Sequence, residues 1–430
     1  MKKALGIFSV MLLFISIMVM AEIYPTSYFE RAKTFMNYLS HGNFQQAEKM
    51  FTQRVMEALP PSKLETIWKS LEAKLGQFEE VKNMNAGKSG DYVVVMVNVE
   101  FKKGYMDFKL VFDSSFKIAG FRITRAKSPK HSLPAYVQLS KFTTREVEIG
   151  QKWKLPAELT VPKGSGPFPA VVLIGGSGPS DMNETIGENE SFKDIAYGLS
   201  SLGIAVLRYD KRAYVYGKEM KKIDVQNVYL QDASYAIEYM LHEPFVDKIF
   251  VLGHSLGAYL LPEIAKENQE VSGLIMMAPP ARPLAEVMVD QLRYISKLFP
   301  QNTEEIQKIL DKLALIEKHE LNPQEFVMGA PASYYYELEK YDPVKILRTL
   351  SKPVLICQGG KDYQVTRKDF EIFEKAFESD PLFTFKWYPN LSHIFTVVNG
   401  IPSPANYNVP SNVSKEVIED LAEWIKSYSP

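Results

Sequence analysis

A short apolar run that ends in a glycine-bounded serine and passes directly into a helical pattern constrains the fold of this chain most. Residues 249–252 form the run, and residues 256–267 repeat apolar side chains at helical spacing. The turn between them reads Gly253-His254-Ser255-Leu256-Gly257. Small residues on both sides of Ser255 are needed where a strand reverses into a helix without room for Cβ atoms. The pattern predicts a strained turn that lifts the Ser255 hydroxyl above a buried sheet.

Apolar strands alternate with helices along the second part of the chain. Strand-like runs occupy residues 147–149, 155–161, 170–174, 205–208, 249–252, 273–277, 354–357 and 383–388. Helical periodicity occupies residues 192–202, 228–241, 256–267, 368–377 and 415–427. This alternation indicates a mostly parallel, doubly wound sheet, so the fold class is α/β. Residues 280–350 show helical periodicity without a convincing strand and are predicted to form an inserted helical cap.

A smaller α+β domain is predicted ahead of this sheet. Residues 28–75 carry apolar side chains at three- and four-residue spacing, which indicates two or three amphipathic helices. Strand-like alternation follows over residues 92–101, 105–112 and 118–123. A polar stretch near residues 125–132 marks the linker. We therefore expect a module over 22–130 and a larger domain over 131–430.

The first 21 residues resemble a secretory signal. Lys2 and Lys3 precede an apolar run, and the segment ends in Val19-Met20-Ala21, a small-residue cleavage pattern. The alternative is an uncleaved membrane anchor, because the apolar run approaches the length that spans a bilayer. We expect export to the periplasm or the medium, without stable membrane association after the signal is removed.

The charge balance and the cysteine count exclude several classes of protein. The chain has 50 basic and 51 acidic side chains, and no segment concentrates the basic ones, so nucleic acid is not an expected partner. Cys357 is the single cysteine, which excludes a disulfide framework and multi-cysteine metal sites. No phosphate-binding or metal-binding motif is present either. We expect neither a metal nor a cofactor, and a small molecule as the ligand.

A nucleophilic serine needs an imidazole to accept its proton and a carboxylate to orient that imidazole. Among the six histidines only His393 follows the last predicted strand, where this architecture places the base. Asp362 follows the preceding strand after two glycines and is the predicted acid. The competitors are Asp369, within a predicted helix, and Asp380, in a turn.

Two backbone N–H groups must stabilise the charge that develops on a carbonyl oxygen during attack. Leu256 N–H, at the start of the helix after the serine, is the first predicted donor. Ser177 N–H, in the turn after residue 174, is the second, with Gly176 or Gly178 as alternatives. The same glycines could belong to a dinucleotide fingerprint, but Asp181 stands where that motif needs its third glycine.

Together these residues resemble the α/β-hydrolase superfamily over roughly 145–430. The resemblance is to bacterial serine esterases near the dienelactone-hydrolase and prolyl-oligopeptidase branch. It lies in Gly175-Gly176-Ser177-Gly178-Pro179, in Arg208-Tyr209-Asp210-Lys211-Arg212, and in Gly359-Gly360-Lys361-Asp362-Tyr363-Gln364-Val365. One departure is Gly175, where many relatives have histidine. The first module is similar in layout to the nuclear-transport-factor-like superfamily. We interpret Arg208 and Asp210 as a structural ion pair rather than as ligands of a substrate.

The resemblance implies a carboxylesterase that acts on short- to medium-chain esters through an acyl-enzyme at Ser255. Two alternatives stay open: an exopeptidase or acyltransferase on the same scaffold, and a binding protein whose triad has lost its activity. Residues 22–130 contain no catalytic or metal-binding pattern. We hypothesise that they mediate dimerisation or shape access to the cap. A homodimer is therefore left open.

Overall fold

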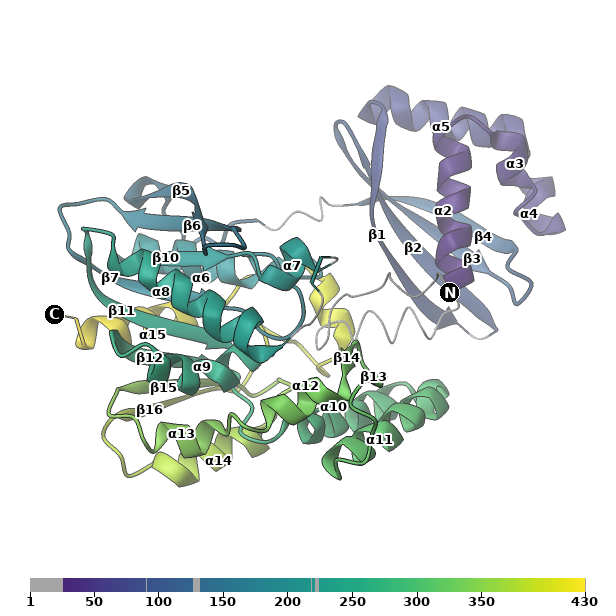
Figure 1. Cartoon of the computed structure of the whole chain (residues 1–430). Helices are drawn as coiled ribbons and strands as arrows, with labels where there is room; N and C mark the ends of the chain where they lie inside the picture. Colours follow the sequence, from purple (N-terminus) through teal and green to yellow (C-terminus); the bar gives the residue numbers. More distant parts are fainter. Residues whose placement is uncertain (1–25, 90, 127–131, 218, 221–223, 430) are drawn as a thin grey trace. The chain divides into compact units, whose positions relative to one another are not determined.

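The computed structural model describes residues 26–89, 91–126, 132–217, 219–220 and 224–429 (Figure 1). Contacts divide the chain into two compact units, with the boundary between residues 130 and 131. We call them the N-terminal unit and the C-terminal unit. The expected signal segment lies outside the described residues. In the part of the chain that is described, no helix combines the length and the apolar character needed to cross a bilayer.

The N-terminal unit is an α+β domain built on an antiparallel sheet. Its helices are α2 (Thr26–Ser40), α3 (Phe44–Glu48), α4 (Gln53–Ala58) and α5 (Pro61–Leu75). Its strands, in spatial order, are β1 (Phe78–Ser89), β2 (Tyr92–Phe101), β3 (Gly104–Phe112) and β4 (Ile118–Ala126). The sequence predicts only two or three helices here, and it does not predict β1, which is rich in polar residues. A separate apolar core that includes Phe35, Trp68 and Phe108 holds this unit together.

The C-terminal unit is built on an eight-stranded sheet with the order β16-β15-β12-β11-β7-β10-β6-β5. The strands are β5 (Phe142–Ile149), β6 (Leu155–Pro162), β7 (Phe168–Ile174), β10 (Ala205–Tyr209), β11 (Val246–His254), β12 (Val271–Met277), β15 (Val354–Gly359) and β16 (Phe383–Tyr388). The six strands from β16 to β10 pair in parallel, whereas β6 and β5 are antiparallel. The predicted mostly parallel, doubly wound sheet is confirmed.

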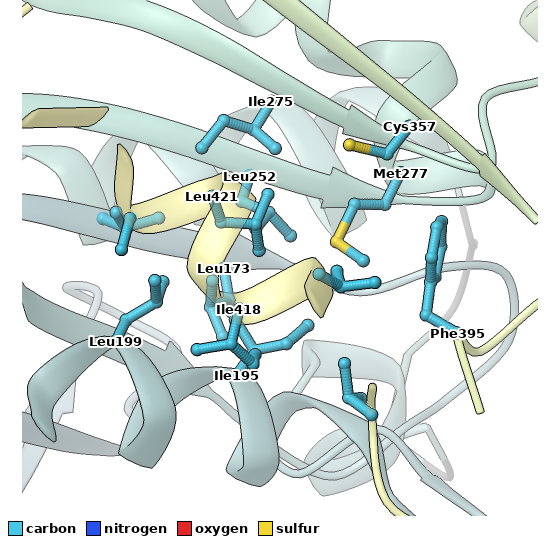
Figure 2. Close-up of a cluster of buried hydrophobic side chains, with 14 of the residues drawn as sticks. Leu173, Ile195, Leu199, Leu252, Ile275, Met277, Cys357, Phe395, Ile418 and Leu421 are labelled. Atoms are coloured by element: carbon cyan, nitrogen blue, oxygen red, sulfur yellow. The ribbon is translucent and has the colours of Figure 1, made fainter. Parts of the chain in front are cut away.

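Helices cover both faces of this sheet. They are α6 (Ser191–Ser201), α8 (Asp232–Leu241), α9 (Leu256–Glu267), α14 (Arg367–Phe377) and α15 (Lys415–Ser427), and α8 is preceded by a π-helix, η2 (Gln226–Gln231). Leu199 of α6 and Leu421 of α15 pack with Leu252 and Cys357 of the strands in one core (Figure 2). Because side chains alternate across a strand, the remaining apolar strand residues face α8 and α9. Burial raises the pKa of the Cys357 thiol to about 12.

The region after β12, for which the sequence predicts a helical cap, contains four α-helices in the part of the chain that the structure describes. Its helices are α10 (Leu284–Leu298), α11 (Thr303–Glu317), α12 (Ala332–Leu338) and α13 (Pro343–Leu347). It also contains the strand pair β13 (Phe326–Val327) and β14 (Ala330–Pro331), which the sequence does not predict. A second such pair, β8 (Thr185–Ile186) and β9 (Asn189–Glu190), precedes α6, and a short helix, α7 (Arg212–Tyr216), follows β10. Strands of two residues are too short to show a hydrophobic period.

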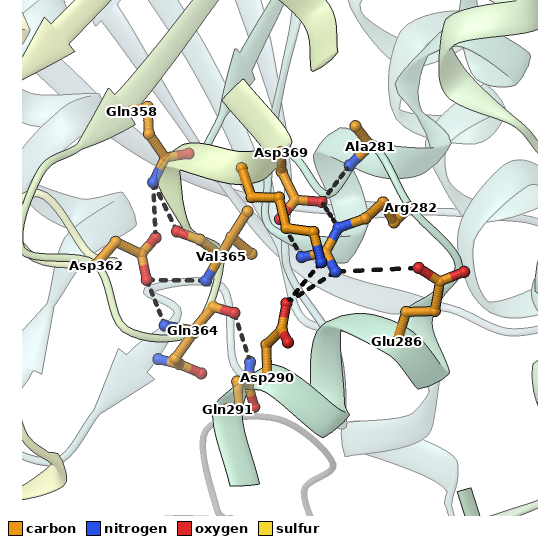
Figure 3. A network of polar contacts seen from close by, with 11 residues as sticks. Ala281, Arg282, Glu286, Asp290, Gln291, Gln358, Asp362, Gln364, Val365 and Asp369 are labelled. Atoms are coloured by element: carbon orange, nitrogen blue, oxygen red, sulfur yellow. Dashed lines mark hydrogen bonds and ion pairs between the residues drawn. The ribbon is translucent and has the colours of Figure 1, made fainter. Parts of the chain in front are cut away.

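A buried arginine joins the start of the cap to α14. Arg282 donates to Asp369 at 2.8 and 3.1 Å and to Asp290 of α10 at 2.8 Å (Figure 3). Asp369 is fully buried and also accepts the Ala281 N–H at 3.0 Å. These bonds tie one end of the cap to the helix that follows the predicted acid.

Arg282→Ala is expected to lower the free energy of unfolding by about 3–5 kcal/mol, because it leaves the Asp369 charge buried without its partner. Chemical denaturation gives the value. Lys308→Ala is the control: it breaks an ion pair with Glu304 that is exposed on α11, and a loss below about 1 kcal/mol is expected. Equal losses in the two variants would contradict a stabilising role for the buried pair.

Candidate active site

Ser255 lies in a turn that only the observed glycines permit. Its φ and ψ angles are 53° and −119°, a positive-φ conformation that is rare for a residue with a side chain. A Cβ on Gly257 would lie 2.3 Å from the Ile174 carbonyl oxygen, and one on Gly253 would lie 2.6 Å from the Ala258 nitrogen. The Ser255 N–H donates to Met277 O at 2.9 Å, which fixes the turn to β12. The predicted strained turn is therefore present between β11 and α9.

The structure brings His393 and Asp362 into contact. His393 Nδ1 lies 2.6 Å from Asp362 Oδ2, and both side chains are buried. Because a carboxylate accepts, this bond places a proton on Nδ1 and leaves Nε2 as the basic nitrogen. The two competing acids lie elsewhere: Asp369 pairs with Arg282, and Asp380 accepts the Leu382 N–H.

Several donors hold Asp362 in place. Oδ1 accepts from the N–H groups of Gln364 and Val365 at 2.7 and 3.0 Å, and Oδ2 accepts from Gln358 Nε2 at 3.0 Å (Figure 3). The Gln364 carbonyl in turn accepts from Gln291 of cap helix α10 at 3.2 Å. These bonds fix the direction of the carboxylate, so Asp362 is suited to orient an imidazole.

His254 connects the serine turn to the loop that carries His393. Its ring lies 4.6 Å from the His393 ring, and its Nε2 donates to the His393 carbonyl at 2.9 Å. Its Nδ1 lies 3.0 Å from Glu184 Oε1. Burial opposes charge on the ring, but the Glu184 carboxylate raises the pKa of His254 above its ordinary value. A buried contact between Glu184 and His254, the residue before Ser255, therefore adjoins the serine turn.

The glycine turn after β7, residues 175–178, lies close to Ser255. A Cβ on Gly176 would lie 3.2 Å from the Ser255 Cβ. The Gly176 N–H donates to Glu184 Oε1 at 2.6 Å and is thereby occupied. Within the described residues, Ser177 N–H and Leu256 N–H donate to no other group. Of the alternatives for the second donor, Gly176 is disfavoured by this geometry.

Three further buried side chains surround the glycine turn. Glu184 accepts the Gly176 N–H, while Lys211 Nζ and the Tyr229 hydroxyl donate to the Gly176 carbonyl at 2.5 and 2.8 Å. Burial lowers the pKa of Lys211 to about 7, although Glu184 and Asp232 raise it. Sequence reasoning missed these residues. Lys211 falls in a quoted motif, but Glu184 and Tyr229 carry no local signal.

One predicted pairing is wrong. Arg208 forms its ion pair with Glu158, at 2.6 Å, and Asp210 instead accepts the Met182 N–H at 2.7 Å. Arg208 and Glu158 are direct partners in the antiparallel register of β10 and β6, so their side chains share one face. Among the described residues, no group of three or more histidine, cysteine, aspartate or glutamate side chains could hold a metal ion.

Comparison with known proteins assigns the chain to a family. Residues 182–397 match the family described as serine aminopeptidase, S33, and the chain belongs to this family of α/β-hydrolases. The resemblance drawn from the motifs is thereby confirmed. Residues 32–121 match a family described as a protein of unknown function, DUF3887.

The chain is also similar to individual proteins. Esterase EstD from Thermotoga maritima is 40% identical over 397 residues, which cover 92% of this chain and 95% of that protein. Two solved structures are also similar. Est1E from Butyrivibrio proteoclasticus matches 66% of this chain and 97% of its own, with 18% identity and a TM-score of 0.43. Hypothetical protein PA2218 from Pseudomonas aeruginosa matches 72% and 100%, with 14% identity and a TM-score of 0.46.

Proposed function

We propose that this protein is a serine carboxylesterase that hydrolyses short- to medium-chain carboxylic esters through an acyl-enzyme on Ser255. The observation that carries the proposal is the buried bond between His393 and Asp362. Ser255 lies in a strained, glycine-bounded turn, and its neighbour His254 contacts His393. The 40% identity to a protein named as an esterase supports the ester as the substrate class.

We assign each of these residues a role in the reaction. Ser255 Oγ attacks the ester carbonyl while His393 Nε2 accepts its proton, and Asp362 holds the imidazole in the tautomer that can do so. The N–H groups of Leu256 and Ser177 stabilise the oxyanion. His393 then protonates the leaving alcohol, and a water molecule activated by the same imidazole releases the acid.

Substrate turnover and covalent labelling test this function together. We expect the purified protein to hydrolyse nitrophenyl acetate and nitrophenyl butyrate faster than aminoacyl nitroanilides, and a fluorophosphonate to modify Ser255, as located by peptide mass spectrometry. Faster cleavage of the nitroanilides would favour an exopeptidase. Absence of both turnover and labelling would indicate a binding protein with an inactive triad.

Export is a further proposal, and it rests on the sequence of residues 1–21. We expect the mature protein to begin at Glu22, because cleavage after Val19-Met20-Ala21 removes the apolar run. Intact-mass measurement on protein secreted by a bacterial host gives the start directly. Full-length protein recovered with the membrane fraction would contradict cleavage and favour the anchor.

A further inference from the structure

The peptide unit between Gly176 and Ser177 is held by its carbonyl oxygen. Lys211 Nζ donates to Gly176 O at 2.5 Å, and the Tyr229 hydroxyl donates to the same oxygen at 2.8 Å. Lys211 also donates to the Tyr229 oxygen at 2.7 Å. All of these side chains are buried, so water does not compete for the carbonyl.

The direction of this carbonyl fixes the direction of the next amide. In a trans peptide the C=O and N–H bonds point to opposite sides, and the bond between Gly176 and Ser177 is trans. Holding Gly176 O toward Lys211 and Tyr229 therefore turns Ser177 N–H away from them. Rotation of this peptide would break two buried hydrogen bonds, one from Lys211 and one from Tyr229.

The peptide between Gly175 and Gly176 is also held by a buried side chain, Glu184. The Gly176 N–H donates to Glu184 Oε1, and this oxygen also contacts His254. Since His254 donates to the His393 carbonyl, the glycine turn is linked to the loop that carries the base. Gly176 has buried side-chain partners on both its N–H and its C=O, whereas Ser177 N–H has none within the described residues.

The two donors on the Gly176 oxygen also polarise the peptide. Hydrogen bonds to a carbonyl oxygen draw electron density from the amide, so the N–H of the same peptide becomes a stronger donor. The donor that this strengthens belongs to Ser177, the residue after Gly176, and a Cβ on Gly176 would lie 3.2 Å from the Ser255 Cβ. Such a donor is useful where negative charge develops in a transition state.

We propose that Lys211 and Tyr229 are positioning residues that orient and polarise the Gly176–Ser177 peptide, so that Ser177 N–H serves as the second oxyanion donor. The proposal rests on the function proposed above, because it needs an oxyanion formed by attack of Ser255. Neither side chain touches the substrate in this scheme, and both act through one backbone amide.

Two substitutions that remove the donors one at a time test the proposal. Tyr229→Phe deletes a single oxygen and Lys211→Met deletes the ammonium at similar length. For nitrophenyl butyrate we expect kcat to fall about tenfold in each variant and about 100-fold in the double variant, with KM within about twofold of the wild type. The inhibition constant of a trifluoromethyl ketone, which forms an oxyanion on the serine, should rise in parallel with the loss of kcat.

Tyr335→Phe is the matched control, since it also deletes a buried phenol hydroxyl that donates to a backbone carbonyl, Val327 O. This variant should leave kcat and the inhibition constant of the ketone unchanged. Unchanged kcat in Tyr229→Phe and in Lys211→Met, with Ser255→Ala inactive, would overturn the proposal and leave the esterase function standing. A lower kcat without weaker binding of the ketone would overturn it as well. Full activity in Ser255→Ala would overturn the esterase function itself.

Discussion

Replacing Ser255 with alanine is expected to lower kcat for nitrophenyl butyrate by about 10⁴-fold or more, because the acyl-enzyme cannot form without the hydroxyl. Labelling by a fluorophosphonate should disappear in the same variant. The substitution removes one oxygen, and the N–H of residue 255 still donates to Met277 O, so the fold should persist. Residual hydrolysis would then come from the oxyanion donors and from binding alone.

Ser234→Ala provides the control for this variant. Ser234 lies on α8 and donates to Leu230 O at 3.0 Å, so the same atom is removed from a hydrogen-bonded serine outside the candidate site. Its kcat should match the wild type. Wild-type turnover in Ser255→Ala would reject Ser255 as the nucleophile.

Asp362→Asn is expected to lower kcat by about 10⁴-fold with little change in KM. The amide nitrogen that replaces one carboxylate oxygen donates instead of accepting, so His393 is driven to the tautomer with its proton on Nε2. That nitrogen can then no longer accept the proton of Ser255. The rate of fluorophosphonate labelling should fall with kcat, because both reactions need the same base.

Asp380→Asn makes the identical chemical change in another loop of the same unit. Asp380 accepts the Leu382 N–H at 3.0 Å, which an asparagine oxygen also does, so kcat should stay unchanged. If Asp362→Asn retained more than about a tenth of wild-type kcat, Asp362 would not be the orienting acid.

The motifs could be predicted because their chemistry is local. The turn around Ser255 needs glycines at fixed distances in sequence, and His393 is the one histidine after the last strand. The buried strands could also be predicted, since strands that are buried on both faces form continuous apolar runs in the sequence. By contrast β1 pairs at the edge of its sheet and carries many polar residues, so no period marks it.

The supporting side chains could not be predicted because only the fold brings them together. Glu184 is 70 residues from His254, and Lys211 is 35 residues from the carbonyl that it binds. The error at Arg208 has the same origin, because its partner is set by the register of two antiparallel strands. Asp210 is close to Arg208 in sequence and was the wrong partner, because Glu158, 50 positions away, lies opposite Arg208 in the sheet.

The buried cysteine of β15 has a practical consequence for following the molecule in solution. Cys357 is the only thiol in the chain, and it is fully buried with a pKa of about 12. Thiol reagents need the exposed thiolate, so they react only when the core around β15 opens. The N-terminal unit contributes no thiol of its own. The rate at which a thiol reagent modifies Cys357 therefore reports how often the core of the C-terminal unit opens, without an engineered cysteine.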